Sequence, residues 1–123
     1  MSRRIAAVGA LTVALAAPAA QAHHSYAMFD RSKTVTLNGT IRQFQWTNPH
    51  SWIQLTVPSD SGATDEWSIE MGSPFELLRV GWTSTTVKAG DKVSIQIHPV
   101  KDGSKGGGFV SGTDAAGRQL GGK

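Results

Sequence analysis

SWIQLTV, at residues 51–57, is the stretch that decides the fold. Its apolar side chains Ile53, Leu55 and Val57 recur at every second position, which is the period of a half-buried β-strand. Polar residues alternate with them on the opposite face, and the turn sequence PSDSG follows at 58–62. We therefore predict a strand over 51–57 that buries one face in a core.

Similar period-two segments surround this strand. Further strands are expected over about residues 34–47, 66–71, 92–99 and around 109–110. The first has a one-residue shift in its apolar phase between Ile41 and Phe44, which predicts a β-bulge. The last is weakly encoded, because the glycines from Gly103 to Gly108 are typical of a flexible loop.

A single helix is expected between the third and fourth strands. Ser73-Pro74-Phe75-Glu76 supplies an N-cap serine, a proline at the first helical position and a glutamate three residues after the cap. Gly81 ends this helix. The element order is that of the oligonucleotide/oligosaccharide-binding (OB) fold, so we predict a mostly β protein, a small five-stranded OB-like barrel. A small open sandwich is the alternative.

The first 22 residues have the order of a secretory signal peptide. Arg3 and Arg4 precede an apolar run at 5–16, and Ala20-Gln21-Ala22 is a small-residue cleavage site. The apolar run is too short to span a bilayer comfortably, so no membrane span is expected after cleavage. We predict a mature protein in the periplasm or secreted; an uncleaved anchor is the alternative.

Cleavage after Ala22 leaves 101 of the 123 residues, which is enough for one hydrophobic core. Residues 23–34 have little apolar periodicity and are expected to form an N-terminal arm, either lying across the barrel or mobile. Residues 35–123 are then the barrel domain, with a glycine-rich C-terminal part.

Composition narrows the function classes. The net charge of +3 falls to +1 in the mature chain, because the signal peptide holds two of the twelve basic residues and none of the nine acidic ones. So weak a charge argues against nucleic-acid binding. Cysteine is absent, which excludes disulfides and thiolate ligands. Without a nucleophile elbow or a phosphate-binding glycine loop, we expect a binding protein and no enzyme.

Several motifs together resemble a known family. They are His23-His24-Ser25-Tyr26, Trp46-Thr47-Asn48-Pro49-His50-Ser51-Trp52, Ser73-Pro74, Gly81-Trp82, Gly90-Asp91 and His98-Pro99. The chain resembles a family of small exported bacterial proteins known as domain of unknown function 6152, over nearly the whole mature chain. The resemblance implies secretion and a β-barrel, and it implies no particular ligand.

Four histidines are candidate metal ligands: His23, His24, His50 and His98. Cleavage after Ala22 makes His23 the first residue, so its amine and imidazole can close a six-membered chelate, as in copper enzymes with a histidine brace. With pKa values of about 8 and 6.5, both groups lose their protons readily near neutral pH. Nitrogen ligands without thiols favour copper, with zinc second.

The two later histidines are expected near the usual ligand face of the OB fold. His50 lies in the loop between the first two strands, and His98 ends the fourth. Met28 or Met71 would add a soft ligand for Cu(I), although the phase of Met71 favours the core. The alternative roles are structural: His50 fixes its turn, His98 ends its strand, and the N-terminal pair belongs to a disordered terminus.

A second candidate surface lies on the polar face of the central strands. The side chains predicted on it are Trp52, Gln54, Ser68 and Glu70. An exposed indole beside polar groups suits a flat ligand or a protein partner, and burial of Trp52 under the arm is the alternative. Trp46 and Trp67 have the phase of core residues, and Trp82 is expected to plug one end of the barrel.

Three functional hypotheses follow. The first is an exported cell-envelope binding protein that holds copper through His23 and His24, with help from His50 or His98. The second is a metal-free module that binds an envelope protein partner or a small ligand. The third, an oxidative copper enzyme, is disfavoured because so small a barrel offers little enclosing pocket.

Overall fold

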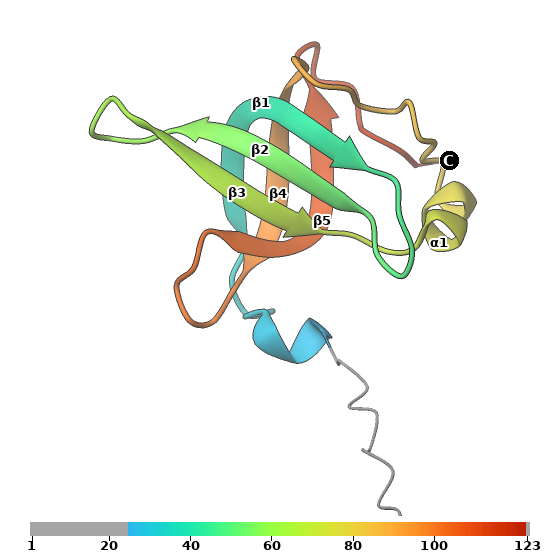
Figure 1. The fold of residues 1–123 in the computed structure, drawn as a ribbon, viewed down its shortest axis with the longest axis horizontal. Helices are drawn as coiled ribbons and strands as arrows, with labels where there is room; N and C mark the ends of the chain where they lie inside the picture. Colours follow the sequence, from blue (N-terminus) through green and yellow to red (C-terminus); the bar gives the residue numbers. More distant parts are fainter. Residues whose placement is uncertain (1–24, 123) are drawn as a thin grey trace, which may run out of the picture.

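The computed structural model describes residues 25–122. Within this range the elements are η1 Ser25–Met28, β1 Val35–Gln45, β2 Trp52–Pro58, β3 Thr64–Glu70, α1 Pro74–Arg79, β4 Lys92–Pro99 and β5 Gly106–Asp114 (Figure 1). The expected signal peptide over 1–22 and the pair His23 and His24 lie outside the described residues.

The strands close into a barrel in the order β1-β2-β3-β5-β4, with β4 pairing back onto β1. Neighbouring strands are antiparallel except β3 and β5, which run parallel over Ser68–Glu70 and Gly106–Gly108. The predicted mostly β, five-stranded OB-like barrel with one short α-helix between β3 and β4 is confirmed for the described residues. The open sandwich is wrong, because β4 gives β1 its second neighbour.

The long first strand, β1, pairs with both β2 and β4. Its first half, Val35–Thr40, pairs with β4, and its second half, Thr40–Gln45, pairs with β2. The register shifts between Ile41 and Gln43, so the predicted β-bulge is confirmed. A bulge bends a strand and increases its twist, which allows β1 to curve around the barrel as Figure 1 shows.

Aliphatic side chains fill the barrel. The most deeply buried are Ile41, Ile53, Leu55, Ile69, Ile95 and Ile97. Trp82 is buried as predicted, with its ring centroid 5.8 Å from that of Phe44 and 5.3 Å from that of Phe109. Met71 is also buried, whereas Trp46 and Trp67 are half-buried and pack against the core.

The last strand begins earlier than the sequence predicts. A loop was expected over 103–108, but Gly106–Gly108 already belong to β5. A Cβ atom at Gly108 would stand 2.9 Å from the Phe29 ring, closer than real side chains approach. The glycines therefore permit close packing between backbone and ring. The expectation of a flexible loop is wrong for these three residues.

The described part of the arm lies on the barrel. Phe29 is 6 % exposed and forms an isolated β-bridge with Val100. The Lys101 N–H donates to the Met28 carbonyl oxygen (2.9 Å), and the Asp30 N–H donates to the Pro99 carbonyl oxygen (2.8 Å). These contacts join the arm to the end of β4, and of the two expected arrangements the first is therefore the one observed from Met28 onward.

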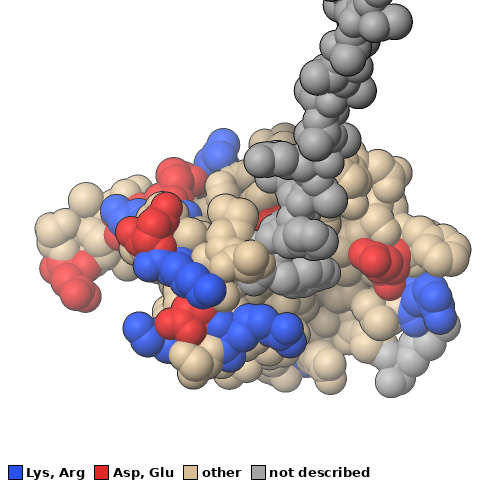
Figure 2. Space-filling model, turned by 90° about the horizontal axis from the view of Figure 1, so that it is seen from below, with Lys and Arg blue, Asp and Glu red and all other residues tan. Residues whose placement is uncertain are grey.

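Opposite charges pair across the surface. The pairs are Lys33–Asp30, Arg42–Glu66, Lys88–Asp91, Lys105–Asp65 and Arg118–Asp114. On the face that Figure 2 presents, basic and acidic side chains lie side by side instead of gathering by sign. This face therefore has no large field of one sign, in keeping with the small net charge.

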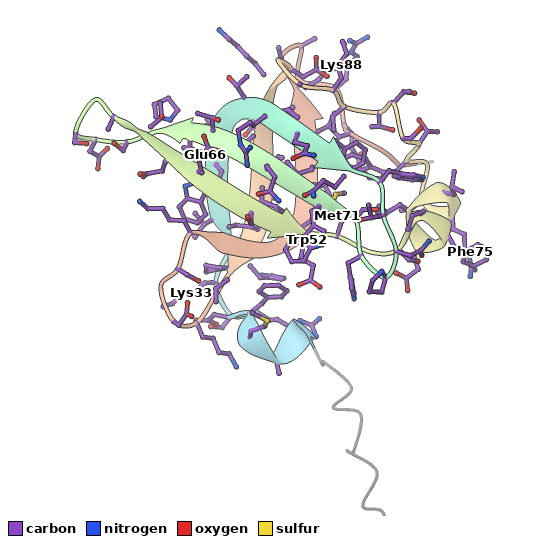
Figure 3. The ribbon with its side chains drawn as sticks, in the orientation of Figure 1. Lys33, Trp52, Glu66, Met71, Phe75 and Lys88 are labelled. Atoms are coloured by element: carbon purple, nitrogen blue, oxygen red, sulfur yellow. The ribbon has the colours of Figure 1, made fainter. Side chains whose placement is uncertain are left out.

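The short helix begins with the predicted cap. The Ser73 hydroxyl accepts from the Glu76 N–H (3.3 Å), and the Glu76 carboxylate accepts from the Ser73 N–H (2.9 Å). Leu77 is buried under the helix, while Phe75 points outward and is 69 % exposed (Figure 3). Among residues 25–122 no helix has the length and apolar character needed to cross a membrane.

Replacing Ser73 by alanine should lower the free energy of unfolding by about 1 kcal/mol, because the Glu76 N–H of the first turn loses the hydroxyl oxygen that caps it. Urea denaturation followed by tryptophan fluorescence measures this difference. Ser84→Ala is the matched control, because the exposed Ser84 side chain makes no hydrogen bond to any described residue. Equal stability of the two variants would show that the cap contributes nothing.

Candidate functional site

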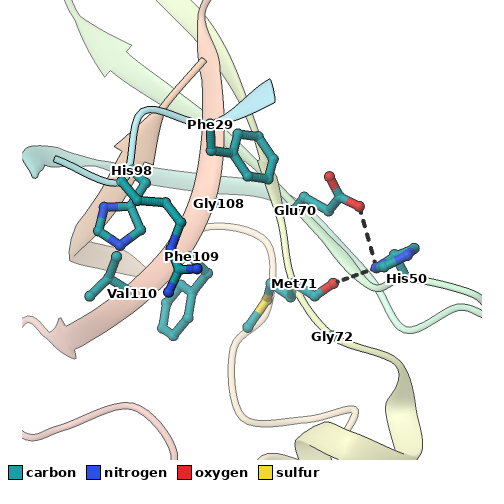
Figure 4. A pocket seen from close by; sticks show the side chains of 10 residues that line it. Phe29, His50, Glu70, Met71, Gly72, His98, Gly108, Phe109 and Val110 are labelled. Carbon is teal, nitrogen blue, oxygen red and sulfur yellow. Dashed lines mark hydrogen bonds and ion pairs between the residues drawn. The ribbon is translucent and has the colours of Figure 1, made fainter. Parts of the chain in front are cut away.

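A pocket of about 460 Å³ opens where the arm meets the ends of β3, β4 and β5. Its lining residues are Phe29, Arg31, His50, Glu70, Met71, Gly72, His98, Gly108, Phe109 and Val110 (Figure 4). The volume lies within the roughly 300–1,000 Å³ that small-molecule sites occupy. Two of the four candidate histidines and one residue of the polar face therefore line one cavity.

His50 is held against the end of β3. Its Nδ1 lies 3.0 Å from the Met71 carbonyl oxygen and 3.3 Å from Glu70 Oε1. A carbonyl oxygen only accepts hydrogen bonds, so Nδ1 carries the proton and donates it. The loop is clamped by hydrogen bonds from Ser51 N–H to the Gly72 carbonyl and from Met71 N–H to the Ser51 carbonyl. The ring is thus fixed, and no hydrogen bond from Nε2 to any of residues 25–122 occurs.

Glu70 is a buried carboxylate at the last position of β3. It is 8 % exposed, although the alternation of β3 predicts it on an exposed face. The His50 imidazole lies against it, with Nδ1 3.3 Å from Glu70 Oε1. The expectation of exposure is therefore wrong for Glu70, and its charge borders the pocket instead.

His98 has the same type of hydrogen bond at the other side of the pocket. Its Nδ1–H donates to the Lys33 carbonyl oxygen at 2.8 Å, which again leaves Nε2 without a partner among the described residues. Figure 4 shows His98 and His50 on opposite sides, with Gly108 and Met71 between them. The two histidines meet in one pocket, as their loops suggested, but they do not form one cluster.

No group of three or more His, Cys, Asp or Glu side chains placed to hold a metal ion occurs within residues 25–122. The proposed ligands His23 and His24 lie outside this range.

The remaining members of the predicted polar face hydrogen-bond to one another. Ser68 Oγ donates to Gln54 Oε1 (2.6 Å), and Gln54 Nε2 donates to Gln45 Oε1 (2.9 Å). Trp52 stands opposite Glu70 in the β2–β3 ladder and is half-buried near the end of β3 (Figure 3). Gln54 and Ser68 thus use hydrogen-bonding capacity internally, and only Glu70 of this face reaches the pocket.

The family of unknown function DUF6152 matches residues 10–109, a span that contains every lining residue of the pocket except Val110. The chain belongs to this family. The resemblance inferred from its motifs is therefore confirmed, while export of its members stays a prediction. No curated protein and no solved structure matches the chain.

The sequence of this DUF6152 chain did not predict several of the residues that line the pocket. Phe29 and Arg31 stand in a segment without periodicity, and Phe109 was expected only as part of a weak strand. Their roles depend on contacts with residues about 70 positions away, such as the bridge from Phe29 to Val100. No local spacing signals such a contact.

Asp30 holds the turn that carries Arg31. Its carboxylate accepts hydrogen bonds from the Ser32 hydroxyl and from the Ser32 N–H, which lower the pKa of Asp30. Because the folded pKa lies below the unfolded one, the resulting stabilisation is present above the unfolded pKa and is lost as the pH falls through the folded pKa.

Replacing Ser32 by alanine should raise the pKa of Asp30 toward its unfolded value, since the first and largest cause of its lowering is removed. A carbon-detected NMR titration of the carboxyl groups measures both midpoints. Asp102, whose pKa is lowered in the same way by Ser104, should not move. An unchanged Asp30 midpoint would refute the assigned cause.

Proposed function

We propose that the chain is an exported binding protein of the bacterial cell envelope, periplasmic or secreted, and not an enzyme. It holds one Cu(II) ion at the Glu70 end of the pocket. The ligands are His23, His24 and His50. Removal of the signal peptide is part of this proposal, because only cleavage after Ala22 gives His23 a free amine.

The hydrogen bonds of His50 are the observation that carries the proposal. A histidine that binds a metal through one ring nitrogen usually donates the other N–H to a carboxylate or a backbone carbonyl. His50 Nδ1 faces both, at Glu70 and Met71, and its Nε2 is left for a ligand. The buried charge of Glu70 further favours a cation at this end of the pocket.

The arm is long enough to bring the N-terminal pair to this pocket. Phe29 lines the pocket, and the preceding turn Ser25–Met28 is a 3-10 helix. Such a helix advances ~2 Å per residue, and extended residues up to ~3.5 Å, so His23 reaches roughly 15 Å from Phe29. This reach supports a site shared by the N-terminus and His50.

The donor set favours copper over other ions. Amine and imidazole nitrogens without thiolates bind Cu(II) most tightly among the common divalent ions, with Zn(II) second. Both nitrogens of His23 lose their protons at modest cost near neutral pH, because their ordinary pKa values are about 8 and 6.5. His98 lies across the pocket beside the turn that carries Arg31, whose positive charge disfavours a cation there.

Isothermal titration of the mature protein with Cu(II) tests the proposal, after intact mass has established that the exported chain begins at His23. We expect one-to-one binding that weakens when a glycine is added before His23, by more than the roughly 10- to 100-fold that loss of an outer hydrogen-bond partner costs. Equal affinity of the two forms would show that the terminal chelate is wrong. No binding by either would favour the metal-free interaction module.

A further inference from the structure

We propose that the Arg31 end of the pocket binds the acidic group of a small amphipathic organic anion, whose apolar body lies against Phe29 and Phe109. This site stands apart from the copper proposal, because it uses the opposite end of the cavity and residues that the copper site does not need.

Arg31 lines the pocket and forms no ion pair within the part of the chain that the structure describes. All nine aspartates and glutamates of the chain lie within residues 25–122, and none of them pairs with Arg31. Its neighbour Lys33, by contrast, pairs with Asp30. A guanidinium group that borders a cavity and lacks an internal carboxylate is available to an anionic ligand, with which it forms charge-assisted hydrogen bonds.

His98 lies at the same end of the pocket as the turn that carries Arg31. Its Nδ1–H donates to the Lys33 carbonyl oxygen, two residues after Arg31, so β4 is tied to the turn that carries Arg31. That turn is itself held by hydrogen bonds from Lys33 N–H to the Asp30 carbonyl and from Ser32 to the Asp30 carboxylate. The backbone that carries Arg31 is therefore fixed at the pocket, so that mainly the Arg31 side chain has to be ordered when a ligand binds.

The middle of the pocket is apolar. Phe29 and Met71 are buried at its wall, and Phe109 packs edge-on against Trp82. The Phe29 ring packs directly against the backbone of Gly108, where a Cβ atom would stand only 2.9 Å from it. A cavity of about 460 Å³ with such walls accepts a ligand of one or two rings.

Charge then orients the ligand. Figure 4 shows Glu70 and His98 on opposite sides of the cavity, with the Phe29 and Phe109 rings between. The buried Glu70 repels an acidic group at its own end, so that group must lie at the Arg31 end. The ligand class is thus a monoanion with an apolar body, and a neutral molecule of the same shape lacks the polar contact.

Two dyes test this with the mature protein in the presence of a chelator. The anionic probe is 8-anilinonaphthalene-1-sulfonate, and N-phenyl-1-naphthylamine is the same body without the sulfonate. We expect Arg31→Gln to weaken binding of the anionic dye by about tenfold or more, as loss of a charge-assisted hydrogen bond predicts, and to leave the neutral dye unchanged. Arg79→Gln, the same change on α1 away from the pocket, should alter neither.

Equal binding of the anionic dye by Arg31→Gln and the unchanged protein would overturn the proposal, and so would equal loss of both dyes. Thermal unfolding of each variant establishes that it is folded. The same titrations on the protein with one glycine before His23 separate this site from the copper site, because that extension removes the proposed chelate and should leave dye binding intact.

Discussion

Replacing Glu70 by glutamine is expected to weaken Cu(II) binding by the mature protein about 10- to 100-fold, the range observed for outer partners of ligating histidines. The carboxylate lies 3.3 Å from His50 Nδ1, and Glu70 is only 8 % exposed. Solvent therefore screens its charge little. Glutamine keeps the shape and removes the charge that, in the proposed site, orients the imidazole and attracts the cation. Competition titration against a chelator of known affinity measures the change.

Glu66→Gln is the matched control for this variant. Glu66 lies on the same strand, four residues earlier, but it is exposed and accepts from Arg42 and Thr56 instead of facing the pocket. Its replacement should leave copper affinity within about twofold, as expected for an exposed charge screened by solvent. Equal losses in the two variants would mean that Glu70 acts only through the net charge of the protein.

Replacing Ile95 by alanine should lower the free energy of unfolding by about 2–5 kcal/mol, the usual cost of truncating a buried isoleucine. Ile95 is fully buried in the middle of β4, opposite Leu37 on β1 and Gly112 on β5. Gly112 has no side chain with which to fill the space left behind. Urea denaturation monitored by circular dichroism gives the difference.

Lys92→Ala is the comparison within the same strand, because Lys92 is exposed at the start of β4. A surface substitution of this kind changes stability by about 0.5 kcal/mol or less. A loss of less than 1 kcal/mol in Ile95→Ala would contradict the assignment of Ile95 to the centre of the barrel core.

Most of the barrel could be predicted from short stretches of the sequence. Alternation of apolar residues such as Ile53 and Leu55 predicts β2, a phase shift after Ile41 predicts the bulge, and the Ser73 capping box predicts the helix. Each of these signals depends on neighbours within a few residues. The sequence predicts them because hydrophobic periodicity and helix capping are local properties of the chain.

The start of β5 and the pocket could not be predicted from the sequence in this way. Gly106–Gly108 lack strand propensity, and they form β5 because they fit between β3, β4 and the Phe29 ring. Glu70 has the alternation of an exposed residue, yet the His50 imidazole lies against it. Such contacts join distant segments, so tertiary packing and not local preference decides them.

The electron paramagnetic resonance spectrum of the protein mixed with one equivalent of Cu(II) tests the proposed copper site most directly. We predict nitrogen hyperfine structure from the terminal amine and the imidazoles, altered both by one glycine placed before His23 and by His50→Ala. Identical spectra from all three proteins would contradict a site that joins the processed N-terminus to the pocket.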